Sequence, residues 1–119
     1  MTKAATEGGT NALVLLASPP MGFRLKEIAD FAIRNRVPSI YDRSNFPEAG
    51  GLMSYGTNIP DMHRRVATYV DKILTGANPS NLAIEQPTKF ELVINLKTAK
   101  QIRLTIPQSV LFRADKVIK

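Results

Sequence analysis

Runs of apolar residues alternate with amphipathic segments in the first part of the chain. Residues 12–17 are all apolar, which is typical of a central parallel strand covered on both faces. Between residues 22 and 35 apolar positions recur at helical spacing with charged residues between them, so this segment is predicted to be a helix with one buried face. Residues 39–41 are short and β-prone. The order strand, helix, strand predicts a right-handed βαβ unit.

Residues 48–56 carry the most distinctive pattern, in which two glycines precede a short apolar stretch and one glycine follows it. This pattern predicts a buried strand with a sharp entry and a sharp exit. A strand that ends in a glycine turn before a helix places Ser54 and Tyr55 at the carboxyl edge of a sheet. Open α/β folds bind their ligands at that edge, so it is the best candidate site in the sequence.

An amphipathic helix is predicted to follow, from about residue 61 to residue 75. Asn58 is a residue type that caps helix amino ends, and Gly76 can end the helix in a left-handed conformation. Its apolar stripe consists of Met62, Val66, Tyr69, Val70 and Ile73.

The last part of the chain predicts one further strand and two helices. Residues 90–94 combine alternation with a buried run, which favours a strand. Asn95 can cap a helix from 96 to about 104, and the apolar positions of residues 108–117 predict a final short helix.

These elements together predict an α/β fold, a three-layer architecture in which βαβ units build a parallel sheet. The length of 119 residues supports one domain, which we assign to residues 12–119. Residues 1–11 are small and polar, and we expect them to form a disordered lead-in without the apolar segment of a signal peptide.

Composition excludes several classes of function. The chain has no cysteine, which excludes disulfides and thiolate sites, and it has no run of about 18 apolar residues that could span a membrane. The net charge of +6 permits weak attraction to polyanions. However, the basic residues are spread along the chain without a long basic run or interleaved aromatics, so the pattern of a nucleic-acid-binding protein is missing.

The sequence contains no catalytic constellation and no metal site, and we expect neither an enzyme nor a cofactor. The lone histidine, His63, has no further ligand residues near it at zinc-binding spacing, and we interpret it as a solvated helix residue. No serine lies in a nucleophile elbow, and the glycine pairs match neither a P-loop nor a dinucleotide fingerprint.

Two kinds of residue near predicted strand ends could contact a ligand. Tyr41 and Tyr55 could stack on a ligand and orient it with their hydroxyls, or they could pack the sheet edge. Asp42 and Asp61 could bind a ligand amine, or they could serve as turn and helix-capping residues. The sequence leaves both alternatives open for each residue.

Several motifs resemble the carboxyl-terminal part of the ABC-transporter substrate-binding protein family, which includes tryptophan- and tyrosine-binding members. They lie at residues 48–56, 69–77, 86–100, 104–107 and 113–115, and the resemblance covers the chain from about residue 11. It implies a type I periplasmic-binding-protein-like fold, of which this chain holds an incomplete portion. In that fold two α/β lobes hold a small ligand in the cleft between them, and a membrane permease recognises the closed form.

The resemblance also implies a set of site residues. The loops after Ala17, Tyr41 and Tyr55 would face the cleft, so we expect Ser18, Tyr41, Asp42 and Tyr55 to bind the ligand. The implied ligand is a small molecule such as an aromatic amino acid, the implied partner is an ABC permease, and the implied location is the periplasm. A chain expressed as written, without a signal peptide, would instead stay in the cytoplasm.

A family member also has a first lobe upstream, so we expect this chain to correspond to a carboxyl-terminal portion. The helix at 61–75 would then expose its apolar stripe, which favours a homodimer or higher oligomer, with exchange of segments as one route. An alternative function follows from this. The chain could be a self-associating structural or regulatory protein that no longer binds solute.

Overall fold

The structure, a computed structural model, describes residues 7–119. By its internal contacts the chain separates into two compact units. The sheet unit takes the described residues up to Gly56 together with Glu91–Lys119, and the α5 unit takes Thr57–Phe90.

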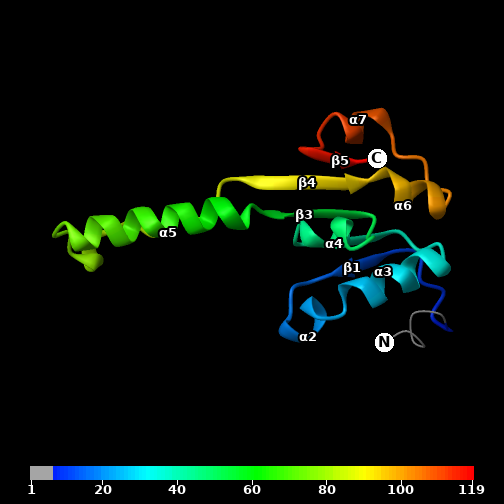
Figure 1. The fold of residues 1–119 in the computed structure, drawn as a ribbon, viewed down its shortest axis with the longest axis horizontal. Coiled ribbons are helices and arrows are strands. Elements are labelled where there is room, and N and C mark those ends of the chain that lie inside the picture. Colours follow the sequence, from blue (N-terminus) through cyan, green and yellow to red (C-terminus); the bar gives the residue numbers. More distant parts are fainter. Residues whose placement is uncertain (1–6) are drawn as a thin grey trace. The chain divides into compact units, whose positions relative to one another are not determined.

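The sheet unit contains a five-stranded sheet in which the strands lie in chain order, β1-β2-β3-β4-β5 (Figure 1). The strands are β1 (Leu13–Leu15), β2 (Ser39–Tyr41), β3 (Met53–Thr57), β4 (Phe90–Asn95) and β5 (Lys116–Ile118). The helices are α2 (Pro19–Gly22), α3 (Leu25–Arg34), α4 (Asn45–Glu48), α6 (Leu96–Gln101) and α7 (Gln108–Leu111).

The sheet is mostly parallel. Leu15 of β1 lies beside Tyr41 of β2, and Tyr41 lies beside Ser54 of β3, with both pairs of strands parallel. The backbone N–H of Asn95 donates to the carbonyl of Leu52 at 2.8 Å, which places the end of β4 beside the start of β3. These two strands are therefore antiparallel, whereas β4 and β5 are parallel. The carboxyl ends of β1, β2 and β3 meet at one edge, and the predicted α/β fold with its βαβ unit is confirmed.

The largest core cluster lies between the first strands and α3. Leu15 and Tyr41 point to the same face, where they pack with Ile28 and Ala29 of α3. The Tyr41 ring meets Phe46 edge to face, with ring centroids 5.7 Å apart. A second cluster consists of Leu52, Ala99 and Ile102. The amphipathic helix predicted over 22–35 thus covers the sheet with its apolar side, although it begins only at Leu25, after the separate short helix α2.

Backbone conformation at one position and close packing at two others explain the glycines of residues 48–56. Gly50 has a φ of +103°, a conformation that L side chains rarely adopt. A Cβ at Gly51 would overlap the Phe46 ring, and a Cβ at Gly56 would overlap the carbonyl oxygen of Asp42. The strand predicted here is confirmed, with Leu52 and Ser54 buried.

Two sequence predictions are wrong in this part of the chain. Residues 12–17 were predicted as a central strand covered on both faces, but β1 lies at the sheet edge, and Val14 and Leu16 are 74% and 72% exposed. An apolar run indicates that a strand can be buried, but it does not reveal whether the strand has neighbours on both sides in the sheet. The helix predicted over 108–117 ends at Leu111, and Lys116–Ile118 form β5 instead.

Asp115 explains the switch from helix to strand. Its carboxylate accepts a hydrogen bond from the Leu92 backbone N–H at 2.8 Å, and its own N–H donates to the Leu92 carbonyl at 2.8 Å. These two bonds align the following residues with β4, so a partner distant in sequence decides their conformation. Asn95 caps α6 as predicted, because its Oδ1 accepts from the Thr98 N–H at 3.1 Å, and the helix ends at Gln101 rather than near residue 104.

The α5 unit consists of α5 (Ile59–Leu74), the 3-10 turn η1 (Pro79–Asn81) and the segment that returns to β4. Asn58 caps α5 by accepting from the Asp61 N–H at 2.8 Å, and Gly76 follows the helix with a φ of +105°. The Tyr69 hydroxyl donates to the Ala83 carbonyl at 2.7 Å, which holds the returning segment against the helix. The predicted helix is confirmed.

No residue of α5 is buried in the part of the chain that the structure describes. Its stripe includes Val66, Val70 and Ile73, and all three are exposed. Among the helices of residues 7–119, none is both long enough and apolar enough to cross a membrane.

Candidate functional site at the carboxyl ends of the strands

The turn after β1 is fixed by its own backbone. The Ser18 carbonyl accepts hydrogen bonds from the N–H groups of Met21 at 3.0 Å and Gly22 at 3.3 Å, and these bonds start α2 directly behind the strand. Proline suits the first turn of a helix because its missing N–H would have no partner there. The Ser18 side chain makes no capping hydrogen bond, so its hydroxyl stays available at the surface.

Asp42 lies where the ends of three strands meet. Its Oδ2 accepts from the Ala17 backbone N–H at 3.2 Å, which links the end of β1 to the end of β2. Its carbonyl oxygen lies where Gly56 of β3 passes closely enough to exclude a side chain. Its Oδ1 is buried and has no hydrogen-bond partner among the described residues.

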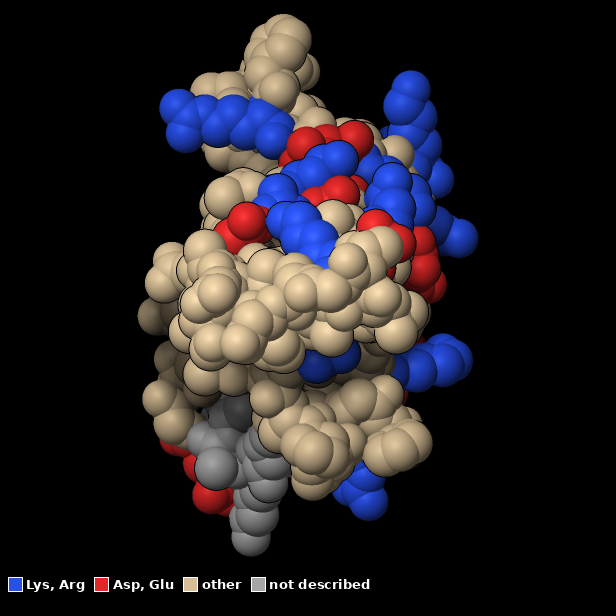
Figure 2. Space-filling view, turned by 90° about the vertical axis from the view of Figure 1, so that its left-hand side faces the viewer, with Lys and Arg blue, Asp and Glu red and all other residues tan. Residues whose placement is uncertain are grey.

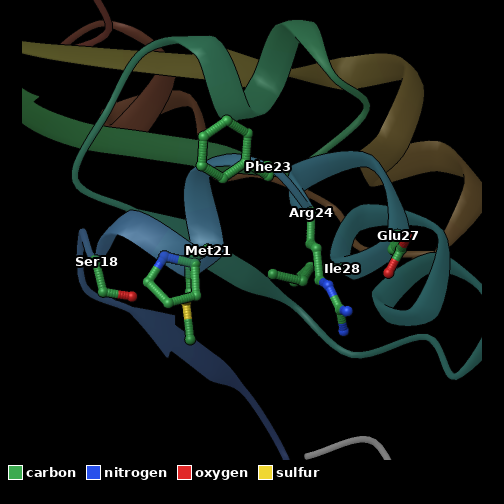
Figure 3. Close-up of a pocket in the computed structure, with 7 residues that line it drawn as sticks. Ser18, Met21, Phe23, Arg24, Glu27 and Ile28 are labelled. Atoms are coloured by element: carbon green, nitrogen blue, oxygen red, sulfur yellow. The ribbon is translucent and has the colours of Figure 1, made fainter.

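Two adjoining hollows open beside these strand ends. The first, here the strand-end hollow, has a volume of about 430 Å³, and the residues around it include Ser18, Phe23, Tyr41, Arg43 and Asn45. The second, here the α2–α3 hollow, has a volume of about 620 Å³. Figure 3 shows Ser18, Met21, Phe23, Arg24, Glu27 and Ile28 around it. Ser18 and Phe23 belong to both hollows.

The four residues expected to bind a ligand take different places. Ser18 and Tyr41 line the strand-end hollow, although most of the Tyr41 side chain lies in the core. Asp42 lines neither hollow described here. Tyr55 is 55% exposed near the end of β3 and also lies outside both hollows. The structure thus brings Ser18 and Tyr41 together and leaves Asp42 and Tyr55 beside them.

Two residues of the strand-end hollow were missed by sequence reasoning. Phe23, between α2 and α3, exposes 93% of its surface. Arg43 is exposed, and no ion pair in residues 7–119 involves it. Arg43 could have been found from its position, since it lies two residues after the end of a predicted strand. Phe23 carries no such signal, because an apolar residue inside a predicted amphipathic helix is interpreted as part of its buried face.

The other acid considered for a ligand amine, Asp61, lies in the α5 unit and is already engaged. Its carboxylate pairs with Arg65 at 3.5 Å and with Arg64 at 4.0 Å. The described residues contain no group of three or more side chains that could hold a metal ion. On the face shown in Figure 2, Lys and Arg side chains are interspersed with Asp and Glu and do not form one continuous basic patch.

The chain is similar in fold to several solved structures. A conserved domain protein from Vibrio cholerae matches with a TM-score of 0.86 and 27% identity over 98% of this chain and 39% of that one. An ABC domain from Streptococcus pneumonia, solved in complex with L-Trp, matches with a TM-score of 0.84 and 22% identity over 98% of this chain and 42% of that one. A search of curated proteins finds no match.

A third similar structure is the ligand-free, open form of a substrate-binding protein with adhesive properties from Clostridium difficile. It matches with a TM-score of 0.70 and 17% identity over 100% of this chain and 42% of that one. The chain therefore spans about two fifths of the length of the structures it matches.

The fold is that of a periplasmic-binding-protein-like α/β protein, of which the chain covers a part. The model of the ABC transporter substrate binding protein family matches residues 4–118, so the chain belongs to that family. This confirms the resemblance found in the sequence. The family is one of solute-binding proteins rather than enzymes, and its members are typically periplasmic.

Proposed function

We propose that the chain is a solute-binding component of an ABC-type uptake transporter and binds a small molecule, such as an amino acid, at the carboxyl ends of β1, β2 and β3. The observation that carries this proposal is the strand-end hollow, which opens where parallel α/β sheets bind ligands. The L-Trp complex of the streptococcal structure supports an amino acid as the ligand. In this account the chain has no enzymatic activity of its own.

Two of the proposed site residues line the hollow, and two lie beside it. Ser18 offers a hydroxyl that makes no capping hydrogen bond to α2, and Tyr41 forms part of the wall of the hollow. Asp42 positions the loop after β1 through Ala17, and Tyr55 provides an aromatic ring near the end of β3. We also propose that residues 12–119 correspond to the carboxyl-terminal part of a solute-binding protein, with an ABC permease as partner and the periplasm as location.

A thermal-shift screen against the amino acids tests this proposal. A ligand at about 100 times its Kd stabilises the folded state by about 2.7 kcal/mol. For a domain of this size, that corresponds to a rise in Tm of roughly 10 °C. We expect one ligand to raise the Tm increasingly with its concentration, and Ser18→Ala to weaken the effect. Ser109→Ala, at an exposed position of α7 outside both hollows, is the matched control.

No concentration-dependent shift with any amino acid or small amide would contradict solute binding by this chain. The second candidate function, self-association without solute binding, would then be favoured over solute binding. The exposed Val66, Val70 and Ile73 of α5 favour that candidate, because a continuous apolar stripe promotes association.

A further inference from the structure

We infer that the strand-end hollow recognises its ligand by an anionic group: Arg43 binds a carboxylate, and Phe23 contacts the apolar body of the same ligand. The inference rests on the proposed function and adds the charge and the shape of the solute. Neither residue belongs to the site expected from the sequence.

The charge of the hollow is the first argument. Arg43 is the one charged residue that lines it in the described part of the chain. Since no ion pair in residues 7–119 neutralises Arg43, its guanidinium is free to bind an anion. A guanidinium presents a planar fork of N–H donors that matches the two oxygens of a carboxylate.

Two further groups beside Arg43 can donate hydrogen bonds. The Ser18 hydroxyl makes no capping bond, and Asn45, which begins α4, contributes its side-chain amide. A carboxylate accepts only, so a lining of one cation, one hydroxyl and one amide suits it.

The neighbouring acids do not provide a comparable site for an amine. Asp42 accepts from Ala17 with one oxygen, its other oxygen is buried, and it does not line the hollow. Glu27 lies in the α2–α3 hollow, where Arg24 is also present. A cationic solute would therefore meet Arg43 without a facing carboxylate in the strand-end hollow.

Phe23 supplies the apolar half of the recognition. Its ring is almost fully exposed, and the backbone behind it is fixed because the Arg24 N–H donates to the Met21 carbonyl at 3.0 Å. The ring lies at the junction of the two hollows, and Met21 and Ile28 continue the apolar lining into the α2–α3 hollow (Figure 3). A ligand held by Arg43 can thus place a ring or a branched apolar group against Phe23.

Three probes that share one phenyl ring test the charge. They are 3-phenylpropionate, which has only the carboxylate, 2-phenylethylamine, which has only the amine, and L-phenylalanine, which has both. We expect 3-phenylpropionate and L-phenylalanine to bind in titration calorimetry and 2-phenylethylamine to bind at least tenfold more weakly. Binding of the amine with none of the carboxylate would overturn the inference and leave solute binding intact.

Matched variants test the two residues. We expect Arg43→Gln to weaken 3-phenylpropionate binding at least tenfold, whereas Arg113→Gln, an exposed arginine outside both hollows, leaves it unchanged. We expect Phe23→Ala to weaken it severalfold, whereas Phe112→Ala, which removes a ring that is 87% exposed outside both hollows, has no effect.

Wild-type affinity in Arg43→Gln would overturn the role of Arg43. An equal loss in Phe23→Ala and Phe112→Ala would overturn the role of Phe23. The circular dichroism and the ligand-free Tm of each variant confirm that it is folded. No binding by the wild-type chain of these three probes or of any amino acid would overturn the inference together with the proposed function.

Discussion

The carboxylate of Asp42 accepts a hydrogen bond from the backbone N–H of Ala17, 25 residues earlier in the chain and 3.2 Å away. This bond ties the loop after β1 to the end of β2. Because the strand-end hollow is built from these two loops, the geometry of the candidate site depends on a residue that does not line it. Asp42 thus acts on the site by positioning the loop after β1.

Asp42→Ala is therefore expected to loosen that loop while costing little global stability. Loss of the hydrogen bond is offset by removal of the buried, unpartnered Oδ1, so we expect a decrease of about 1 kcal/mol in the free energy of unfolding. Hydrogen exchange at the Ala17 amide should become at least tenfold faster. Asp30→Ala removes an exposed pair with Lys26 and serves as the control. Unchanged exchange at Ala17 would contradict this role of Asp42.

Gly56→Ala is expected to be strongly destabilising. The added Cβ would overlap the Asp42 carbonyl oxygen, so the backbone of β2 or β3 must move. We expect a loss of about 2 kcal/mol or more in the free energy of unfolding, measured by urea denaturation. At Gly22, in α2, an added Cβ meets no atom within 4 Å, so Gly22→Ala should be neutral or stabilise by about 0.5–1 kcal/mol. Equal effects of the two substitutions would refute the close approach at Gly56.

Val70→Lys tests self-association through the exposed stripe of α5. We expect the wild-type chain to have a mass of at least two copies of the 13.1 kDa chain in light scattering. Val70→Lys should shift it toward one copy, because a charge disfavours burial of the stripe. Thr68 is also exposed but lies on the opposite side of the helix, so Thr68→Lys should leave the mass unchanged. A wild-type mass of one chain would exclude the predicted oligomer.

Local signals allowed much of the fold to be predicted. Helical spacing located α3 and α5, and the cap at Asn58 and the left-handed Gly76 marked the ends of α5 correctly. The pattern of apolar residues gave wrong predictions where a contact with residues distant in sequence decides the secondary structure. Asp115 pairs with β4, and β5 forms where a helix was predicted. The apolar run at residues 12–17 could not reveal that β1 lies at the edge of the sheet formed by the described residues.

The candidate site could be predicted only in part. Of the four residues expected to bind a ligand, Ser18 and Tyr41 line one hollow, and their role in binding stays a prediction. The hydrogen bond from the Ala17 N–H to Asp42 joins two loops and cannot be read from the sequence, which left Asp42 open as a ligand group or a turn residue. Arg43 and Phe23 were missed because the sequence does not reveal that both line one hollow, where Arg43 makes no ion pair within residues 7–119 and the Phe23 ring is exposed.

The most direct test of solute binding at the strand ends is a chemical-shift map. The ligand with the largest Tm shift would be titrated into the ¹⁵N-labelled chain. We predict that the amide signals of residues 17–24, apart from the two prolines, and of residues 41–45 shift together and saturate, while the signals of the central residues of α5 do not shift. Shifts confined to α5, or no saturable shift at either loop, would contradict the proposed site.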